Sequence, residues 1–359
     1  MSDKRKIAVV FFNLGGPNSP EAVQPFLFNL FNDKAIIGAP QPIRWLIAKL
    51  ISTRRAPIAQ EIYKELGGSS PLLPNTEAQA AALDSYLSEN LAEDIEAKTF
   101  IAMRYWHPFA AETVQKVKDW GADEIVLLPL YPQFSTTTSE SSIHDWKKWA
   151  AKLGLKKPTQ SICCYPTHDG FINAVSALVE ASLTELAAKD IKSDIRILYT
   201  AHGLPQKVVD GGDPYQWQVE QTAKAIAERV SDTFADFKDS DWRCCYQSRV
   251  GPLEWIKPYT EDEIIQAGQD GKALVVVPIA FISEHSETLV ELDIEYKELA
   301  EENGIKHYSR VATVDCHPEF IKSLGELVTE QVNMGISGKI HSQEKTKICP
   351  KKFDRCICN

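Results

Sequence analysis

The chain has 359 residues, a mass of 40.1 kDa and a formal charge of −10, from 39 basic and 49 acidic residues. Its content of 44% apolar and 25% charged residues is typical of a soluble globular protein and excludes the disordered class. The acidic balance argues against nucleic acid as a partner, because phosphate binding needs a basic surface. No run approaches the roughly 20 apolar residues of a membrane-spanning helix.

The N-terminus, MSDKRKIAVVFFNLGG, places basic residues before a short apolar run. That run ends at NLGG without a cleavage-like site, so we interpret it as a first strand and not as a signal peptide. At this length one hydrophobic core would be crowded, and two domains are expected.

Short apolar runs and longer helical patterns alternate along the chain. In chain order we predict a strand at 7–12, a helix at 77–91, a strand at 125–130, a helix at 171–188, a strand at 195–199, a helix at 217–230, a strand at 274–279 and a helix at 319–333. Continuous apolar strands are typical of parallel sheets covered on both faces. The alternation therefore predicts βαβ units and doubly wound α/β domains.

The two halves of the chain resemble each other. VVFFNLGGP (9–17) aligns with ILYTAHGLP (197–205), and VLLPLYPQFS (126–135) aligns with VVVPIAFISE (275–284). We infer two similar domains with a boundary near 165–190. Because ligands bind at the carboxyl ends of parallel strands, segments 13–17, 131–135, 200–205 and 281–287 are predicted around one cleft.

His202 and an acidic ladder are the candidate chemical groups of the second half. His202 follows a predicted strand, and Glu287, Glu291 and Glu295 recur every four residues, which on an α-helix stacks three carboxylates on one face. No lysine follows Glu287 or Glu291 at the spacing of an ion pair. The pattern indicates a divalent metal or a proton path, and a solvated acidic helix face is the alternative.

The apolar stretch at 25–57 is interrupted by Gly38 and two prolines and closes on basic residues. It fits a helical hairpin that lies on a membrane or lines an apolar pocket, and it also fits a pair of core helices. Just after it, Arg55, Tyr63 and the GGSSP turn offer donors for carboxylates. No G-x-G-x-x-G, P-loop or G-x-S-x-G motif supports a dehydrogenase, NTPase or hydrolase.

Three of the eight cysteines lie in the last eleven residues, at Cys349, Cys356 and Cys358. A disulfide framework is not expected in a chain of this size without a secretion signal. Clustered thiols indicate a metal or iron–sulfur centre, and a tail with spare thiols is the alternative.

These motifs together resemble the ferrochelatase family. The resemblance runs through NLGGP, RRAPxxQExYxxxGGSSP, RYWHP, YPQFS, TAHGLP, YQSRVGPLEW and PIAFxSEHSETLxELDIEY, in that order. It implies two Rossmann-like domains without a nucleotide. It also implies insertion of ferrous iron, the metal substrate, into a porphyrin with loss of two pyrrole protons.

The resemblance also implies roles for single residues. His202 matches the active-site histidine, to which either proton abstraction or an early contact with the substrate iron is assigned. Glu287 matches the catalytic glutamate, a second candidate contact of that iron, and Glu291 with Glu295 matches a path for protons or metal. Residues that match the porphyrin pocket, its propionate-binding groups or the support of the site are Leu14, Arg55, Tyr63, Ser70, Arg104, Tyr131, Trp255, Phe281 and His285.

The tail resembles that of family members with a 2Fe–2S cluster, which needs four ligands. The animal enzymes place the fourth near the YPQYS-like block, where residues 134–138 of this chain contain no cysteine. The pair Cys163 and Cys164 is the best substitute, and because successive strand residues face opposite ways, one of the two is expected to bind. The choice between them stays open, with the pair at 244–245 and then Cys316 as weaker options.

The resemblance predicts domains at 1–175, with a porphyrin-covering lip at about 25–70, and at 176–340, followed by a cysteine-rich tail at 341–359. The expected reaction gives protohaem from protoporphyrin IX, the terminal step of haem synthesis. The alternatives are iron insertion into coproporphyrin and a non-catalytic haem- or iron-sensing protein. We expect a cytoplasmic protein, peripheral on the inner membrane through the lip, with a homodimer as one of the oligomeric states that the family shows.

Overall fold

The computed structural model describes residues 4–189, 191, 194–234, 241–335 and 340–358. The chain divides into two compact units. Unit 1 comprises Met1–Cys164, Leu324–Ile348 and Ile357–Asn359, and unit 2 comprises Tyr165–Ser323 and Cys349–Cys356. The sequence prediction put the domain division at 175/176 and began the tail at 341.

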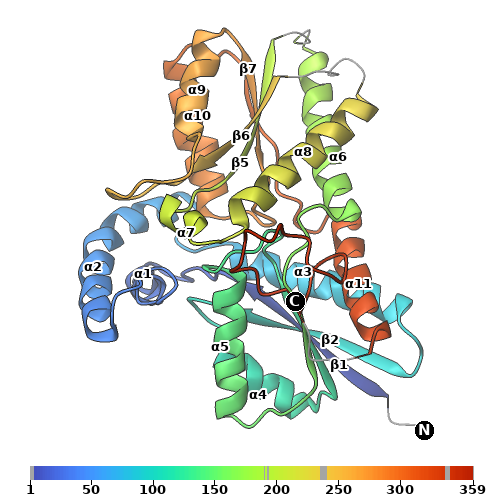
Figure 1. Ribbon diagram of the computed structural model, residues 1–359. Helices are drawn as coiled ribbons and strands as arrows, with labels where there is room; N and C mark the ends of the chain where they lie inside the picture. The colour runs from blue at the N-terminus through green and yellow to red at the C-terminus, as the bar shows by residue number, and fades with distance from the viewer. Residues whose placement is uncertain (1–3, 190, 192–193, 235–240, 336–339, 359) are drawn as a thin grey trace. The chain divides into compact units, whose positions relative to one another are not determined.

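Unit 1 is built on a parallel sheet of five strands in the order β2-β1-β3-β4-β9 (Figure 1). The strands are β1 (Arg5–Asn13), β2 (Ile95–Met103), β3 (Glu124–Pro129), β4 (Thr159–Ile162) and β9 (Ile340–His341). Its helical segments are η1 (Pro20–Ala22), α1 (Val23–Phe31), α2 (Gln41–Glu65), α3 (Leu72–Asn90), α4 (Ala110–Trp120) and α5 (Ser139–Lys152). Buried β1 side chains such as Val10 and Phe12 pack against Val114 of α4 and Trp146 of α5, so these two helices cover one face of the sheet.

Unit 2 is built on a parallel sheet of four strands in the order β6-β5-β7-β8. The strands are β5 (Ile195–His202), β6 (Asp241–Gln247), β7 (Ala273–Pro278) and β8 (Tyr308–Arg310). The helices are α6 (Asp169–Ala187), α7 (Gln206–Asp210), α8 (Tyr215–Thr233), α9 (Thr260–Gln269), the π-helix η3 (Glu287–Glu295) and α10 (Tyr296–Glu302). In Figure 1, α9 and α10 lie on one side of this sheet and α6 and α8 on the other. Helix α11 (Pro318–Asn333) begins in unit 2 and ends in unit 1.

The predicted α/β class is confirmed, because both sheets are parallel and helices alternate with strands. The four predicted strands correspond to β1, β3, β5 and β7, and the four predicted helices to α3, α6, α8 and α11. These four strands are the buried ones: Ile7 through Phe12 are at most 1% exposed, and β7 is buried along its whole length. The other strands were not predicted, since most are short or partly exposed.

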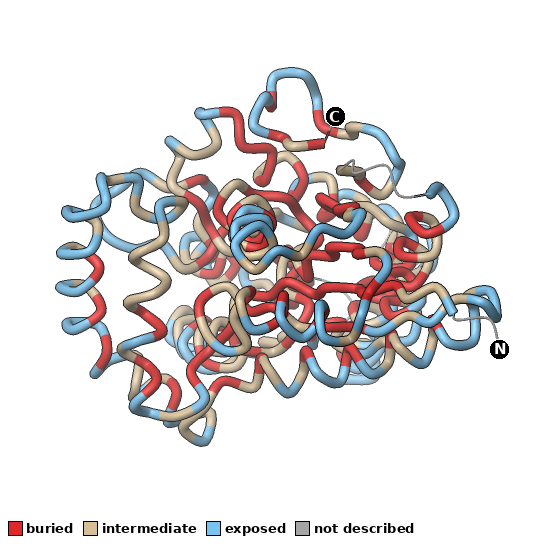
Figure 2. The backbone as a smooth tube through the Cα atoms, turned by 90° about the horizontal axis from the view of Figure 1, so that it is seen from below, coloured by how far each residue is buried: buried red, intermediate tan, exposed pale blue. Residues whose placement is uncertain are grey.

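The apolar stretch at 25–57 forms α1, part of α2 and their connection. The buried residues of α2 are small, apart from Tyr63, whereas Trp45, Leu46 and Leu50 are 45%, 63% and 51% exposed. Figure 2 shows the exposed and buried positions alternating along this helix. Helix α2 is therefore not a core helix. Among the described residues, none of the helices has the length and apolarity needed to cross a membrane.

Candidate functional site

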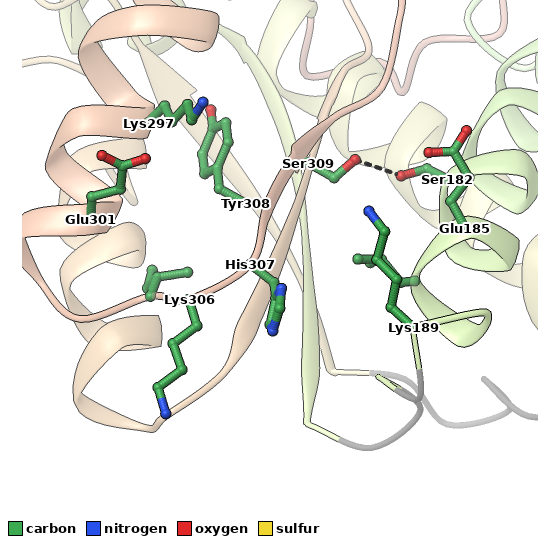
Figure 3. A pocket seen from close by; sticks show the side chains of 11 residues that line it. Ser182, Glu185, Lys189, Lys297, Glu301, Lys306, His307, Tyr308 and Ser309 are labelled. Atoms are coloured by element: carbon green, nitrogen blue, oxygen red, sulfur yellow. Dashed lines mark hydrogen bonds between the residues drawn. The ribbon is translucent and has the colours of Figure 1, made fainter.

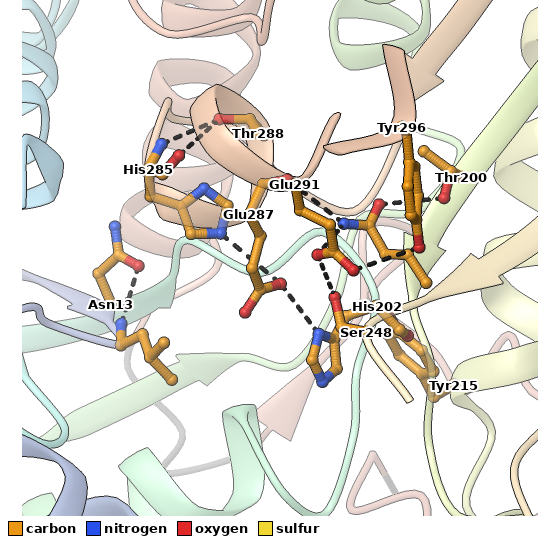
Figure 4. A network of polar contacts seen from close by, with 12 residues as sticks. Asn13, Thr200, His202, Tyr215, Ser248, His285, Glu287, Thr288, Glu291 and Tyr296 are labelled. Carbon is orange, nitrogen blue, oxygen red and sulfur yellow. Dashed lines mark hydrogen bonds and ion pairs between the residues drawn. The ribbon is translucent and has the colours of Figure 1, made fainter. Parts of the chain in front are cut away.

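The main polar site of unit 2 joins the end of one strand to the start of one helix. His202 is the last residue of β5, and Glu287 is the first residue of η3, in the connection that follows β7. His202 Nδ1 lies 2.9 Å from Glu287 Oε2 (Figure 4). Because β5 and β7 are neighbouring parallel strands, their carboxyl ends bring the two residues together. The structure thus pairs the two residues that the sequence singled out as catalytic.

Each residue of this pair shifts the proton affinity of the other. Burial works to lower the pKa of His202, but the charge and hydrogen bond of Glu287, with the charge of Glu291, raise it above its ordinary value. Burial works to raise the pKa of Glu287, but the charges and hydrogen bonds of His202 and His285 hold it well below its ordinary range. Glu287 therefore strengthens His202 as a base, and His202 with His285 keeps Glu287 ionised.

Glu291 forms a second polar centre one turn along η3. Its carboxylate accepts hydrogen bonds from Gln247 Nε2 at 2.9 Å, Ser248 Oγ at 2.5 Å and Tyr296 Oη at 3.2 Å (Figure 4). Burial, followed by the negative charge of Glu287, raises the pKa of Glu291. Glu291 therefore holds a proton at higher pH than an ordinary glutamate.

The acidic ladder lies on a π-helix and not on the α-helix that the four-residue spacing predicted. A π-helix makes i→i+5 hydrogen bonds, and such turns are frequent at functional sites. Glu287 and Glu291 face the polar network, whereas Glu295, the last residue of η3, is exposed. The three carboxylates therefore have three different environments.

Arg310, at the end of β8, fixes the beginning of η3. Its guanidinium lies 2.6 Å from Glu284 Oε1 and 2.8 Å from Asp293 Oδ1. Burial works to raise the pKa of Glu284, but hydrogen bonds and the charge of Arg310 hold it below its ordinary value. One arginine thus ties the loop before Glu287 to the middle of the π-helix.

Three predicted pocket residues of unit 2 surround the His202 and Glu287 pair. The Phe281 and His285 rings are 4.7 Å apart, and His285 Nε2 lies 3.9 Å from Glu287 Oε2. The ring of Trp255 lies 6.3 Å from that of His202. The apolar rings and the polar pair belong to one site within unit 2.

The remaining predicted pocket residues lie in unit 1. Leu14 follows β1, Tyr63 is a buried residue of α2, buried Ser70 precedes α3, and Tyr131 follows β3. Arg55 is an exposed residue of α2 whose guanidinium carbon lies 5.9 Å from the centroid of the Phe31 ring.

Arg104 occupies a polar cluster that the sequence did not predict. Its guanidinium lies 2.8 Å from Asp33 Oδ2 and 2.8 Å from Ser141 Oγ, and Tyr105 Oη donates to the same Asp33 oxygen at 2.9 Å. A second carboxylate, on Asp145, lies 3.8 Å away. Burial works to raise the pKa of Asp33, but the charge of Arg104 and the hydrogen bonds hold it below its ordinary value. Two carboxylates therefore already balance the charge of Arg104.

Two pockets are associated with the units. One of about 350 Å³ in unit 1 includes Arg104 with Phe109 and Trp149 in its lining. The other, of about 200 Å³ in unit 2, is shown in Figure 3 and is lined by Lys189, Lys297 and other polar residues, but by none of the predicted site residues.

The cysteines are distributed over both units. In unit 1, the buried Cys163 Sγ lies 3.2 Å from Cys164 Sγ and is hydrogen-bonded to buried Cys358 as well, and these contacts raise the pKa of Cys163. In unit 2, Gln218 Nε2 donates to Cys349 Sγ at 3.1 Å, and Cys356 is buried. Among the residues that the structure describes, no group of three or more His, Cys, Asp or Glu is arranged to hold a metal ion.

Sequence reasoning missed several polar partners of the site, notably Asp33, Tyr215, Ser248 and Tyr296. Ser248 lies inside the YQSRVGPLEW block and Tyr296 is the last residue of the PIAFxSEHSETLxELDIEY block, so both had a usable signal. Nothing in the pattern marked Asp33 or Tyr215, which reach their partners from other segments of the chain.

Comparison with known proteins agrees with the fold. The two parallel α/β units define a two-domain protein of the chelatase fold. Solved chains of similar fold include SirB from Bacillus subtilis with Fe3+, with a TM-score of 0.51, 12% identity, and coverage of 92% of this chain and 98% of that chain.

The family model named Ferrochelatase matches residues 6–332. Relatives named ferrochelatase include those of Phenylobacterium zucineum, 50% identical, and Pelagibacter ubique, 48% identical, each over 98% of both chains. The chain belongs to the ferrochelatase family.

Proposed function

We propose that this chain inserts ferrous iron into protoporphyrin IX to give protohaem, the terminal step of haem synthesis. The observation that carries the proposal is the pair of His202 and Glu287 at 2.9 Å, in a chain of the ferrochelatase family. Iron insertion replaces two pyrrole N–H protons, so the reaction needs a base that works near neutral pH.

In the proposed reaction His202 removes pyrrole protons. Glu287 engages Nδ1, which makes Nδ1 the protonated nitrogen of the neutral ring and leaves the lone pair of Nε2 for the substrate. The carboxylate then stabilises the imidazolium that proton transfer produces. His285 supports Glu287, and the same His202 and Glu287 side chains are the candidate first contacts of the iron substrate.

Glu291 is the proposed next proton acceptor. Its raised pKa suits a group that takes up and releases a proton, and its three hydrogen-bond donors keep it in place. Glu295, which is exposed, would complete the path to water. In this proposal Glu287, Glu291 and Glu295 form a path along which protons leave the site or iron enters it.

For the porphyrin, we propose that Leu14, Tyr131, Trp255 and Phe281 supply apolar contacts to the macrocycle. The proposed propionate-binding groups are Arg55, Tyr63 and Ser70, whose types suit a carboxylate. Arg104 is better suited to shaping the pocket, since Asp33 and Asp145 already balance its charge.

We propose a 2Fe–2S cluster held by Cys163, Cys349, Cys356 and Cys358. The support is the resemblance of the tail to that of cluster-containing family members, because these cysteines are buried but no group of three among the described residues is arranged as a metal site. Cys163 is the proposed fourth ligand because it contacts the tail cysteine Cys358. When bound, such a cluster would supply redox and structural iron chemistry to the tail.

We propose that the protein is peripheral to the inner membrane on its cytoplasmic side. The support is the row of exposed apolar side chains on α2, including Trp45, Leu46 and Leu50, together with basic residues at Lys49 and Arg54. A homodimer is proposed on the resemblance to the family alone.

Anaerobic iron insertion into protoporphyrin and into coproporphyrin, followed by haem absorbance, tests the proposed reaction. We expect a higher kcat/KM with protoporphyrin. A preference for coproporphyrin would reassign the substrate, and porphyrin binding without insertion of iron into either would point to a sensor.

A further inference from the structure

Tyr215, the first residue of α8, holds the backbone of His202. Its hydroxyl donates to the carbonyl oxygen of His202 at 3.0 Å, and its side chain is buried (Figure 4). Burial, followed by the charge of Glu287, raises the pKa of Tyr215, so the phenol stays protonated as a donor. The direction of the His202 side chain thus depends on where the first turn of α8 lies.

The turn before α8 is stabilised by contacts between its own residues. The fully buried carboxylate of Asp213 accepts from the backbone N–H of Tyr215 at 2.9 Å. Gly212 has a φ of +94°, which a residue with a side chain rarely adopts. Gly212 and Asp213 therefore fix the backbone conformation that places Tyr215.

The tail segment 349–356 packs on this turn, in the same unit. The backbone N–H of Arg355 donates to the Gly212 carbonyl at 3.3 Å, and a Cβ on Gly212 would lie 2.1 Å from an oxygen of Asp354. The rings of Trp217 and Phe353 are 6.0 Å apart. In Figure 1 the tail runs beside α7 and the start of α8.

A side chain of α8 also contacts a tail cysteine. Gln218, fully buried, donates to Cys349 Sγ at 3.1 Å. This hydrogen bond ties the first residue of the tail segment to the same turn that holds Tyr215.

We propose that Tyr215 is a positioning residue for His202, and that the tail segment 349–356 braces the turn 212–218 that carries Tyr215. The inference rests on the proposed function, in which His202 is the base. Small displacements of a catalytic group are costly, because a misplacement of about 1 Å can reduce the rate about 100-fold. Through this brace the cysteine-rich tail would affect the position of His202 without contacting the substrate.

The test compares Tyr215→Phe and Phe353→Ala with three matched controls. Tyr259→Phe removes a hydroxyl that makes no hydrogen bond with the described residues, Lys351→Ala changes an exposed tail residue, and Phe353→Tyr keeps the aromatic ring. The first readout is the split between kcat and KM. We expect both test variants to lose about 10-fold in kcat with little change in the KM for porphyrin, and the controls to behave as the parent protein.

The second readout is the NMR signal of the His202 Nδ1–H, which reports the hydrogen bond to Glu287 without turnover. We expect this signal to move upfield or broaden in Tyr215→Phe and Phe353→Ala and to stay unchanged in the controls. An unchanged His202 signal in Tyr215→Phe, the milder variant, would overturn the proposal even if Phe353→Ala unfolds. If His202→Ala still inserts iron, the base assignment fails, whereas the NMR comparison still decides whether the brace exists.

Discussion

A double-mutant cycle on His202 and Glu287 tests whether the two side chains act as one catalytic unit. Two opposite charges about 4 Å apart interact by about 4 kcal/mol at an effective dielectric constant of about 20. The His202 and Glu287 side chains are 36% and 28% exposed, so solvent screening reduces this to about 2 kcal/mol. Glu287→Gln, which keeps the shape and removes the charge, is therefore expected to lower kcat/KM about 30-fold.

Loss of the proposed base is expected to cost more. His202→Ala is expected to lower kcat/KM about 10²- to 10⁴-fold, the usual contribution of a general base. The double variant should be no worse than His202→Ala within about 3-fold, since a carboxylate without an imidazole has nothing to stabilise. The assay is anaerobic haem formation under saturating iron. A further 30-fold loss in the double variant would show that the residues act independently and would refute the pairing.

Three other predictions concern stability, the tail and α2. Asp33→Asn should destabilise the protein by about 1.5–3 kcal/mol at pH 7. The pKa of Asp33 is lower in the folded than in the unfolded chain, so its ionised carboxylate stabilises the fold at every pH above the unfolded-state pKa. This stabilisation is lost as the pH falls through the folded-state pKa. In urea unfolding, the difference between variant and parent should shrink toward pH 3, and a constant difference would contradict this sign. Cys163→Ser should abolish the visible absorbance of the purified protein while Cys164→Ser retains it, and loss in both or in neither would contradict the choice of Cys163. Replacing Leu46 and Leu50 by Asn should reduce sedimentation with anionic vesicles at least several-fold and leave the melting temperature unchanged, whereas unchanged binding would remove α2 as the membrane contact.

The sequence predicted the candidate site residues that lie near the ends of buried strands. His202 was predicted because it follows a continuous apolar run, which is the buried central strand β5. Glu287 was predicted from its four-residue spacing to Glu291 and from the resemblance to the family, and it lies in the connection after β7. The predicted α-helical geometry of the ladder was wrong, because a π-helix differs from an α-helix by its hydrogen-bond pattern and not by a composition that the spacing reveals.

Other parts of the site depend on tertiary contacts that no local pattern encodes. Asp33 reaches Arg104 across 71 positions of the chain, and Tyr215 reaches back to the His202 carbonyl across the α7 turn. The exposure of Trp45 and Leu46 was likewise not decidable, since an apolar helix pattern fits a core as well as a surface.

The most direct test of the central claim is a single-turnover experiment with the porphyrin-loaded protein. Ferrous iron is added without oxygen, and haem absorbance and proton release are followed together in a weakly buffered solution with a pH indicator. The account predicts one haem and two protons for each porphyrin bound, with His202→Ala still binding porphyrin but forming haem at least 100-fold more slowly. Porphyrin binding without haem formation in the parent protein, or an undiminished rate in His202→Ala, would contradict it.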